Sequence, residues 1–309
     1  MNITIKVFGV IIAAMMTVSM AGCVSISESY SNADKYSAGN TGFNGSDVRS
    51  LDINWSCGKV TVSRHDQDTV TVTESSKDDL KDSQKVRTWL DGNVLRIQFC
   101  KSGEAFFFKQ VDKELEVKIP MDMELDDIDY DGSAGGLFLE EITAATIEAD
   151  VSSGTVSLTD CSAKEIDAES SSGDIIIGQK GESDIIKADT SSGSVEIKAE
   201  KVGRIEADTS SGRIEVNADE AGKVETESSS GKNVLRFGTM PSETEIDTSS
   251  GDVKVCVPEN AGFTLDIDTS SGDFDYDVPL SKDGGSYISG DGSSKVKIDT
   301  SSGDIYVTN

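Results

Sequence analysis

Apolar and polar residues alternate along most of the chain after Asp47, in short runs that are interrupted by the motif Ser-Ser-Gly. In IEADTSSGRIEV, at 205–216, every second residue on either side of the motif is apolar. A period of two is typical of a β-strand with one face buried and the other exposed to solvent. The segment therefore predicts two strands joined by a tight corner at Gly212.

The same segment recurs at a period close to 20 residues. Its glycine falls at Gly154, Gly173, Gly193, Gly212, Gly231, Gly251, Gly272 and, after a longer step, Gly303. A period this short fits one coil of a β-solenoid better than a helical repeat, because two short strands and two corners fill it. We expect the glycines to sit at corners that need a positive φ, with the two serines satisfying corner backbone groups. A degenerate copy, SAGG, ends at Gly136.

The pattern divides the chain into four parts. Repetitive coils of an all-β, parallel solenoid are predicted over 141–309, after a more irregular β section over 47–140 that contains strand-like runs such as LDINWSCGKVTV. Residues 24–46 are rich in Ser, Asn and Gly without apolar periodicity, which predicts a flexible tether. The coils should stack in chain order, with residues 277–292 as a bulging loop and the Gly303 copy closing the array.

The first 23 residues predict export. Lys6 precedes an apolar run, and small residues follow before a cysteine, as in a secretion signal. The sequence Met20-Ala21-Gly22-Cys23 resembles a bacterial lipobox, in which Cys23 becomes the lipidated first residue of the mature protein. Attached acyl chains would hold the protein stably at a membrane. We therefore expect a signal peptide over 1–23 and a protein lipid-anchored to the bacterial membrane on its extracytoplasmic side, with an ordinary cleavage site as the alternative.

The net charge of the chain limits the classes of partner that it can bind. The chain has 309 residues, a formal net charge of −28 and a pI near 4.2. Nucleic acid is excluded as a partner, because its phosphates would be repelled, and anionic lipid is not attracted. Cations or basic partners are the natural counterparts.

Stacking the coils in register predicts two outward columns of side chains on one face. The first is Asp150, Glu169, Asp189, Asp208, Glu227, Asp247, Asp268 and Asp299, and the second is Glu148, Asp167, Lys187, Glu206, Glu225, Glu245, Asp266 and Lys297. Neighbours at roughly 4.8 Å would repel one another, so screening, raised pKa values or bound cations must lower the repulsion. Specific calcium sites, a diffusely hydrated face and a defined basic partner are all open interpretations. No other cofactor is expected.

Four cysteines remain after export, and none forms a Cys-x-x-Cys pair. Metal-site and redox-motif interpretations are therefore weak. Cys57 and Cys100 could be bridged, whereas Cys161 and Cys256 are expected to be small apolar fillers.

The order of these segments resembles a known family. LDINWSCGKVTV, then VKIPMDMELDDIDYDGSAGGLFLEEI, the recurring DTSSGDVKV units and finally ISGDGSSKVKIDTSSGDIYV are similar to the bacterial domain of unknown function labelled "putative adhesin", over about 47–309. The resemblance implies a right-handed β-solenoid of short parallel strands on secreted or membrane-attached proteins. It brings no catalytic motif.

These observations favour a non-enzymatic, lipid-anchored envelope or cell-surface protein whose acidic face serves adhesion, envelope organisation or sensing. Its partners would be an envelope protein, a cell-wall polymer, a host surface or, through the edge strands of the end coils, a second copy. The main alternative is a polysaccharide lyase or glycosidase on a β-helix. A serine hydrolase is disfavoured because His65 is the single histidine. Ice binding by a threonine column is a third class, with Thr190, Thr209, Thr248, Thr269 and Thr300 as its members.

Overall fold

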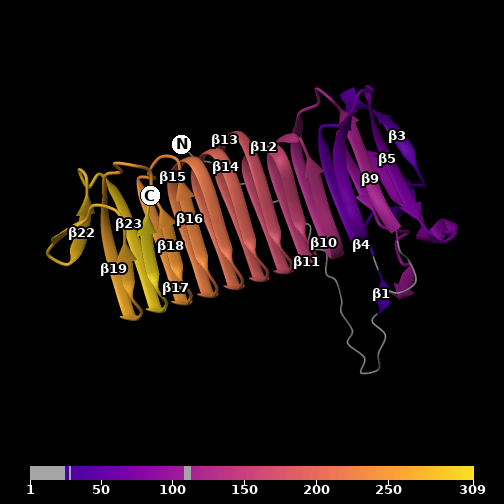
Figure 1. The fold of residues 1–309 in the computed structure, drawn as a ribbon. Coiled ribbons are helices and arrows are strands. Elements are labelled where there is room, and N and C mark those ends of the chain that lie inside the picture. The colour runs from indigo at the N-terminus through magenta and orange to yellow at the C-terminus, as the bar shows by residue number, and fades with distance from the viewer. Residues whose placement is uncertain (1–24, 28, 108–112) are drawn as a thin grey trace, which may run out of the picture.

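The protein is an elongated stack of parallel strands (Figure 1). The computed structural model describes residues 25–27, 29–107 and 113–309. The predicted all-β, parallel solenoid is confirmed, because successive coils pair strand on strand in parallel register along the stack. The predicted signal peptide and Cys23 lie outside the described residues. No helix in the described ranges has the length and apolar character needed to cross a membrane.

Six long strands build the middle of the stack. They are β10 (Leu125–Glu140), β11 (Thr143–Ser153), β12 (Val156–Ser172), β13 (Ile175–Ser192), β14 (Val195–Ser211) and β15 (Ile214–Ser230). Each of β12 to β15 bends through a corner and so contributes to both faces of the solenoid. On β14, for example, Val195 and Ile197 are buried on one face, and Ile205 and Ala207 are buried on the other. Alternation with period two therefore continues across the corner, and it fills the interior with aliphatic side chains.

The C-terminal coils do not stack in chain order. The strands are β16 (Asn233–Phe237), β17 (Glu243–Ser250), β18 (Val253–Cys256), β19 (Phe263–Ser271), β20 (Phe274–Tyr276), β21 (Ser281–Asp283), β22 (Ser286–Ser289), β23 (Ser294–Ser302) and β24 (Ile305–Thr308). Strand β23 pairs with β17 on one side and with β19 on the other, and β24 likewise lies between β18 and β20. The last coil is thus inserted into the stack, where Figure 1 shows it in yellow inside the outermost orange coil.

This order corrects the predicted one. The Gly303 copy does not close the array; the coil of β19 and β20 does. Residues 281–289 form a hairpin rather than a plain loop, since β21 pairs with β22 and β22 runs antiparallel along Phe263–Leu265 at the outer edge of β19. The hairpin brings the chain back past the coil of β19 and β20. Strands β23 and β24 can therefore lie between that coil and the coil of β17 and β18.

The N-terminal end is a cap of short strands. They are β1 (Ser25–Ser27), β2 (Ser37–Ala38), β3 (Thr41–Asn44), β4 (Ser50–His65), β5 (Thr69–Ser76), β6 (Arg87–Asp91), β7 (Val94–Gln98), β8 (Ala105–Phe107) and β9 (Lys113–Pro120), with 3₁₀ turns at Ala33–Lys35, Gly45–Asp47 and Asp82–Gln84. Strand β4 pairs in parallel with β10 and, on its other side, with β7 and then β9. Two antiparallel extensions follow, β7–β6–β2 and β9–β5–β3.

The cap changes two predicted boundaries. Within the predicted tether, β1, β2 and β3 are hydrogen-bonded strands, and the ring centroids of Tyr30 and Tyr36 lie 4.9 Å apart. This region is part of the folded body, because backbone pairing and aromatic contacts order it without any apolar periodicity. The regular coils also begin before residue 141, since β10 already stacks in register on both β4 and β11.

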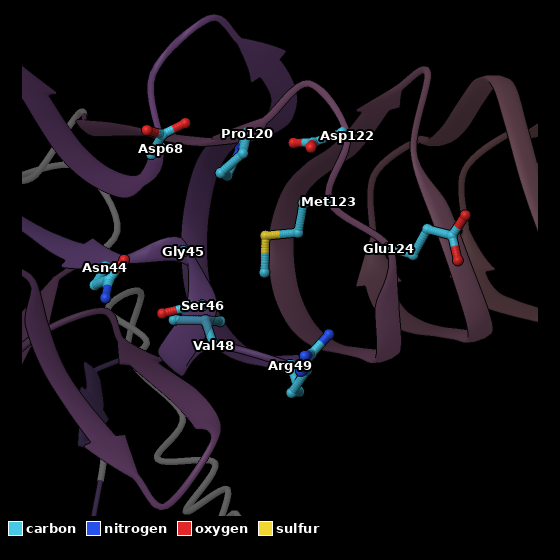
Figure 2. A pocket seen from close by; sticks show the side chains of 10 residues that line it. All are labelled: Asn44, Gly45, Ser46, Val48, Arg49, Asp68, Pro120, Asp122, Met123 and Glu124. Atoms are coloured by element: carbon cyan, nitrogen blue, oxygen red, sulfur yellow. The ribbon is translucent and has the colours of Figure 1, made fainter.

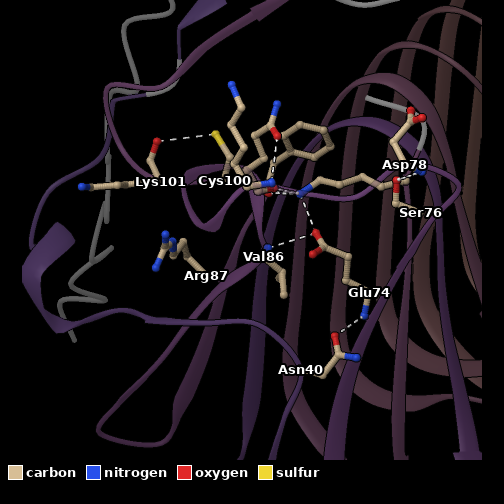
Figure 3. Close-up of polar contacts among 12 residues, drawn as sticks. Asn40, Glu74, Ser76, Asp78, Val86, Arg87, Cys100 and Lys101 are labelled. Atoms are coloured by element: carbon tan, nitrogen blue, oxygen red, sulfur yellow. Dashed lines mark hydrogen bonds and ion pairs between the residues drawn. The ribbon is translucent and has the colours of Figure 1, made fainter. Parts of the chain in front are cut away.

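A buried ion pair lies inside the cap (Figure 3). The side chain of Lys113 is fully buried, and its Nζ donates hydrogen bonds to Glu74 Oε1 at 2.5 Å, to the Gln84 carbonyl oxygen at 2.7 Å and to the Phe99 carbonyl oxygen. Its ammonium group lies 4.0 Å from the Phe99 ring centroid and 4.8 Å from that of Trp55. Glu74 Oε1 also accepts from the backbone N–H of Val86. These contacts stabilise two charges that water no longer reaches.

Candidate functional site

The corner glycines form a column in which backbones almost touch. A Cβ atom added to Gly173 would lie 1.9 Å from the carbonyl oxygen of Gly154, and one added to Gly193 would lie 2.0 Å from that of Gly173. At every member of the column, an added Cβ atom would clash with the carbonyl oxygen of the corner glycine in the preceding coil. In spatial order the members are Gly154, Gly173, Gly193, Gly212, Gly231, Gly251, Gly303 and Gly272. A positive φ was the expected reason for glycine, and φ is 153° at Gly154. Close approach of successive coils is the stronger reason, because it holds at every member.

In three of the coils the residue before the Ser-Ser pair, and not the pair itself, donates a hydrogen bond to a corner carbonyl oxygen. Thr190 Oγ1 donates to the Gly173 carbonyl oxygen at 3.0 Å, and Thr209 Oγ1 donates to that of Gly193 at 3.1 Å. The two serines of the motif are exposed in every coil. The threonines point inward, with exposed fractions of 0% at Thr190 and 4% at Thr209. A buried column cannot present hydroxyls to ice, so that interpretation was wrong.

The first acidic column is confirmed as a physical ladder. Its register partners run Asp150, Glu169, Asp189, Asp208, Glu227, Asp247, Asp299 and Asp268, with the last two exchanged relative to the predicted order. Ion pairing is sparse along this column. Across residues 25–27, 29–107 and 113–309, the single ion pair to these eight carboxylates joins Lys297 and Asp299, at 2.5 Å.

The second column is largely neutralised. Lys187 lies 3.5 Å from Asp167, Arg204 pairs with Glu206 and Glu225, and Lys223 lies 2.8 Å from Glu225. At the C-terminal end Lys297 lies 3.3 Å from Glu245. The hydrogen bond from Lys223, together with Arg204, lowers the pKa of the Glu225 carboxyl.

The pKa values follow this difference in pairing. Burial, together with Asp189, Glu227 and Glu206, raises the pKa of Asp208 to about 6. Burial and neighbouring carboxylates also raise the pKa values of Glu169 and Asp247. From Asp150 to Asp247 the first column therefore bears repulsion that no ion pair among the described residues offsets, whereas most acids of the second column have a basic partner.

The sequence analysis missed the N-terminal end of both columns. Asp131 pairs in register with Asp150, and Asp129 pairs with Glu148 on one side and Asp52 on the other. Burial, with Asp52, Asp131 and Glu148 around it, raises the pKa of Asp129 to about 6. The signal was present, because these acids stand four and six residues before Gly135, as Asp150 and Glu148 stand before Gly154. Gly135, rather than Gly136, is the corner glycine of this coil.

A polar groove of about 410 Å³ follows the first column at the C-terminal coils. Acids and the hydroxyl side chains beside them line it: Glu227, Ser228, Ser229, Asp247, Thr248, Ser249, Asp268, Ser270, Asp299, Thr300 and Ser301. Within the described part of the chain, no group of three or more His, Cys, Asp or Glu side chains is arranged to hold a metal ion. Calcium binding by the columns stays a prediction.

A second hollow, of about 400 Å³, lies at the N-terminal end (Figure 2). Met123 points into it, Asp68 and Asp122 flank it on one side, and Arg49 lies on the other. The loop that forms one wall is held by Arg64, whose guanidinium donates to the carbonyl oxygens of Pro120, Met121 and Met123. Its mixed charges and lone methionine form no recognisable catalytic set.

The remaining candidate residues have structural contacts. The thiol of Cys100 donates to the Lys101 carbonyl oxygen, so the bridge to Cys57 that the sequence left open is not formed in this structure. Cys161 is buried, as expected of an apolar filler. His65 ends β4, and its Nε2–H donates to the Thr69 carbonyl oxygen at 2.6 Å.

A family model described as Toastrack DUF4097 matches residues 48–308. The chain belongs to this family. The Toastrack match includes β4 to β9 of the N-terminal cap as well as the coils, which confirms the resemblance seen over 47–309. A search of curated proteins finds no match.

Three solved structures are similar to this Toastrack chain. A "putative adhesin" from Bacteroides fragilis is 16% identical, covers 70% of this chain and 95% of its own, and has a TM-score of 0.47. A "putative adhesin" from Parabacteroides distasonis is also 16% identical, over 70% of this chain and 93% of its own, with a TM-score of 0.43. A "putative cell adhesion protein" from Clostridium sporogenes is 12% identical over 89% and 99%, with a TM-score of 0.28. Likenesses at these TM-scores assign no function.

Proposed function

We propose that this protein is a non-enzymatic protein of the bacterial envelope, lipid-anchored through Cys23, that presents the first acidic column to a cationic partner surface. The partner would be an envelope protein, a cell-wall polymer or a host surface, and the role would be adhesion or envelope organisation. Membership of the Toastrack family is compatible with this role and brings no catalytic motif.

The observation that carries the proposal is the unequal placement of basic residues. Lys187, Arg204, Lys223 and Lys297 all form ion pairs with the second column, and only Lys297 also reaches the first. Both columns occupy the same strands, so bases could stand beside either. A face selected for stability alone would have both columns neutralised, since unpaired like charges in register destabilise a sheet. Burial raises the pKa values of Asp208 and Asp247, and neighbouring carboxylates add to the shift, which supports repulsion along the first column.

Binding is tested with the exported chain carrying Cys23→Ser. Purified protein is sedimented with cell-wall sacculi and, separately, is passed over immobilised envelope proteins at low and high salt. We expect salt-sensitive binding that falls at least tenfold in Asp189→Asn/Asp208→Asn/Glu227→Gln. The matched control is Glu182→Gln/Glu200→Gln/Glu220→Gln, which removes three exposed acids from the corner between the two faces of the same coils. Equal binding by both triple variants, or no binding to either fraction, refutes the proposal.

The anchor is tested separately. Cells that produce the full chain are fed a labelled fatty acid, and the label should enter the wild-type protein and be absent from Cys23→Ser. Label in both proteins, or in neither, removes Cys23 as the anchor.

A further inference from the structure

The outermost C-terminal coil leaves part of a sheet edge open. Strands β23 and β24 pair with the inner side of β19 and β20. On the outer side, β22 covers Phe263–Leu265. Elsewhere along this outer side, at 266–271 and along β20, no strand of the described chain is paired. Alternate backbone N–H and C=O groups of an edge strand point away from its sheet and can hydrogen-bond to another strand.

Apolar side chains at this edge are also more exposed to solvent than their register partners on the neighbouring strands. Ile267 and Phe274 are half-buried, whereas their register partners Ile298 and Ile305 have exposed fractions of 0% and 1%. The Tyr276 side chain is 47% exposed, with its ring centroid 5.3 Å from that of Phe274. An added strand with apolar side chains at alternate positions would cover this surface.

The edge is strongly acidic. Residues 266–277 contain five aspartates and no base. Asp266 accepts a hydrogen bond from Ser286, and Asp277 accepts from Tyr306 and Thr308. The other three, Asp268, Asp273 and Asp275, are exposed along the open part of the edge.

The fold already contains a strand that matches such an edge. Strand β23 reads SKVKIDTSS and lies directly against the inner side of β19, with Lys297 in register with Asp266. Lys297 pairs with Glu245 on the other neighbouring strand and with Asp299 on its own strand. The strand that packs against β19 thus alternates apolar residues with lysine at 295 and 297 and with Asp299, which is in register with Asp268.

A second copy of the same edge would fit poorly, because aspartates would face aspartates. Each such pair at roughly 4.8 Å repels by about 0.9 kcal/mol at the dielectric constant of water, before screening. We propose that the open edge of β19 and β20 binds an extended polypeptide segment of alternating basic and apolar residues, which adds to the sheet as a further strand. This site lies at the open end of the stack, where Asp268 is also the last member of the first acidic column. The inference rests on the open edge of β19 and β20 and not on the proposed function.

The test uses two fluorescent peptides and the exported chain carrying Cys23→Ser. The first peptide is SKVKIKTSS, the β23 sequence with lysine in place of its aspartate, so that a lysine can face Asp268. The second is SEVEIETSS, which has the same apolar pattern and opposite charge. Fluorescence anisotropy should show saturable binding of the lysine peptide, and at least tenfold weaker binding of the glutamate peptide.

A charge reversal locates the site. Asp268→Lys/Asp275→Lys should weaken binding of the lysine peptide at least tenfold. Asp189→Lys/Glu196→Lys makes the same change at the equivalent positions of an interior coil, and it should leave the affinity within twofold. All four positions are exposed, and circular dichroism confirms that each variant is folded.

Three results would overturn the inference. They are no saturable binding of the lysine peptide, equal loss in both double variants, and a dimer in sedimentation velocity that Asp268→Lys/Asp275→Lys abolishes. The last result would assign the edge to a second copy instead.

Discussion

Replacing Asp208 by asparagine should stabilise the protein at neutral pH. Asp208 lies between Asp189 and Glu227 in the first column, and its pKa is raised from 3.8 to about 6. A shift of that size corresponds to roughly 3 kcal/mol of destabilisation when the carboxyl is ionised, which is an upper limit for a partly exposed group. The two column neighbours alone, at roughly 4.8 Å and screened by about 0.1 M salt, account for roughly 1 kcal/mol. We expect Asp208→Asn to raise the free energy of unfolding by about 1–2 kcal/mol at pH 8.

The sign of the pH dependence is fixed by the raised pKa. An acid whose folded pKa lies above its unfolded pKa destabilises the fold while ionised, and this penalty disappears as pH falls from the folded value to the unfolded one. The advantage of Asp208→Asn should therefore be complete above pH 7 and vanish near pH 4. Urea unfolding followed by far-ultraviolet circular dichroism, at pH 8, 6 and 4, measures it.

Glu225→Gln is the matched control, because Lys223 and Arg204 lower the pKa of Glu225 on the same strand. That variant should lose stability at pH 8, and the loss should shrink as pH falls through the range in which the carboxylate protonates. An Asp208→Asn protein that is no more stable than wild type at pH 8, or whose gain is the same at every pH, would refute unrelieved repulsion in the first column.

Three further changes test other features. Gly193→Ala places a Cβ atom 2.0 Å from the Gly173 carbonyl oxygen and should destabilise the protein by at least about 3 kcal/mol in urea unfolding, whereas Gly285→Ala, with no atom within 4 Å, should be neutral. Lys113→Met leaves the Glu74 carboxylate buried without its cation and should destabilise by about 3–5 kcal/mol; Lys113→Met/Glu74→Met should recover part of that loss, and no recovery would contradict a charge effect. Calcium titration by calorimetry should give saturable heat and a chelator-sensitive melting temperature if the columns bind the ion, and neither effect if the face is only hydrated.

Much of the solenoid could be predicted because each coil repeats the same local chemistry. The alternation around Gly212 predicts both strands, and the spacing from each glycine predicts which acids share a column. The same spacing applied at Gly135 would also have found Asp129 and Asp131. Local sequence patterns could not predict which coils stack on one another. The copies ending at Gly272 and Gly303 carry the same DTSSGD motif, so either can pair with β17, and only the hairpin at 281–289 decides between them.

The N-terminal cap was harder to predict from the sequence for a different reason. Strands β2 and β3 are two and four residues long, which is too short to show a period, and each pairs with a neighbour along one side. This part of the chain is held in place by contacts with residues distant in sequence. One example is the hydrogen bond that Tyr30 Oη donates to the Cys100 carbonyl oxygen. The role of the corner threonines was missed, although the alternation that buries Ile205 and Ala207 also places Thr209 on the inward side.

The inserted last coil makes the C-terminal end of the stack dependent on the complete chain. During synthesis, β19 and β20 emerge before β23 and β24. Apart from β22 along Phe263–Leu265, they have no paired neighbour in the described chain until residues 294–308 arrive between them and β17 and β18. Stacking in chain order therefore continues only as far as β17 and β18. A chain that lost residues 294–308 would lack an internal layer and not merely an outer one. Removal of β23 and β24 would leave the coil of β17 and β18 and the coil of β19 and β20 without the strands that join them, and protease digestion should begin at these coils.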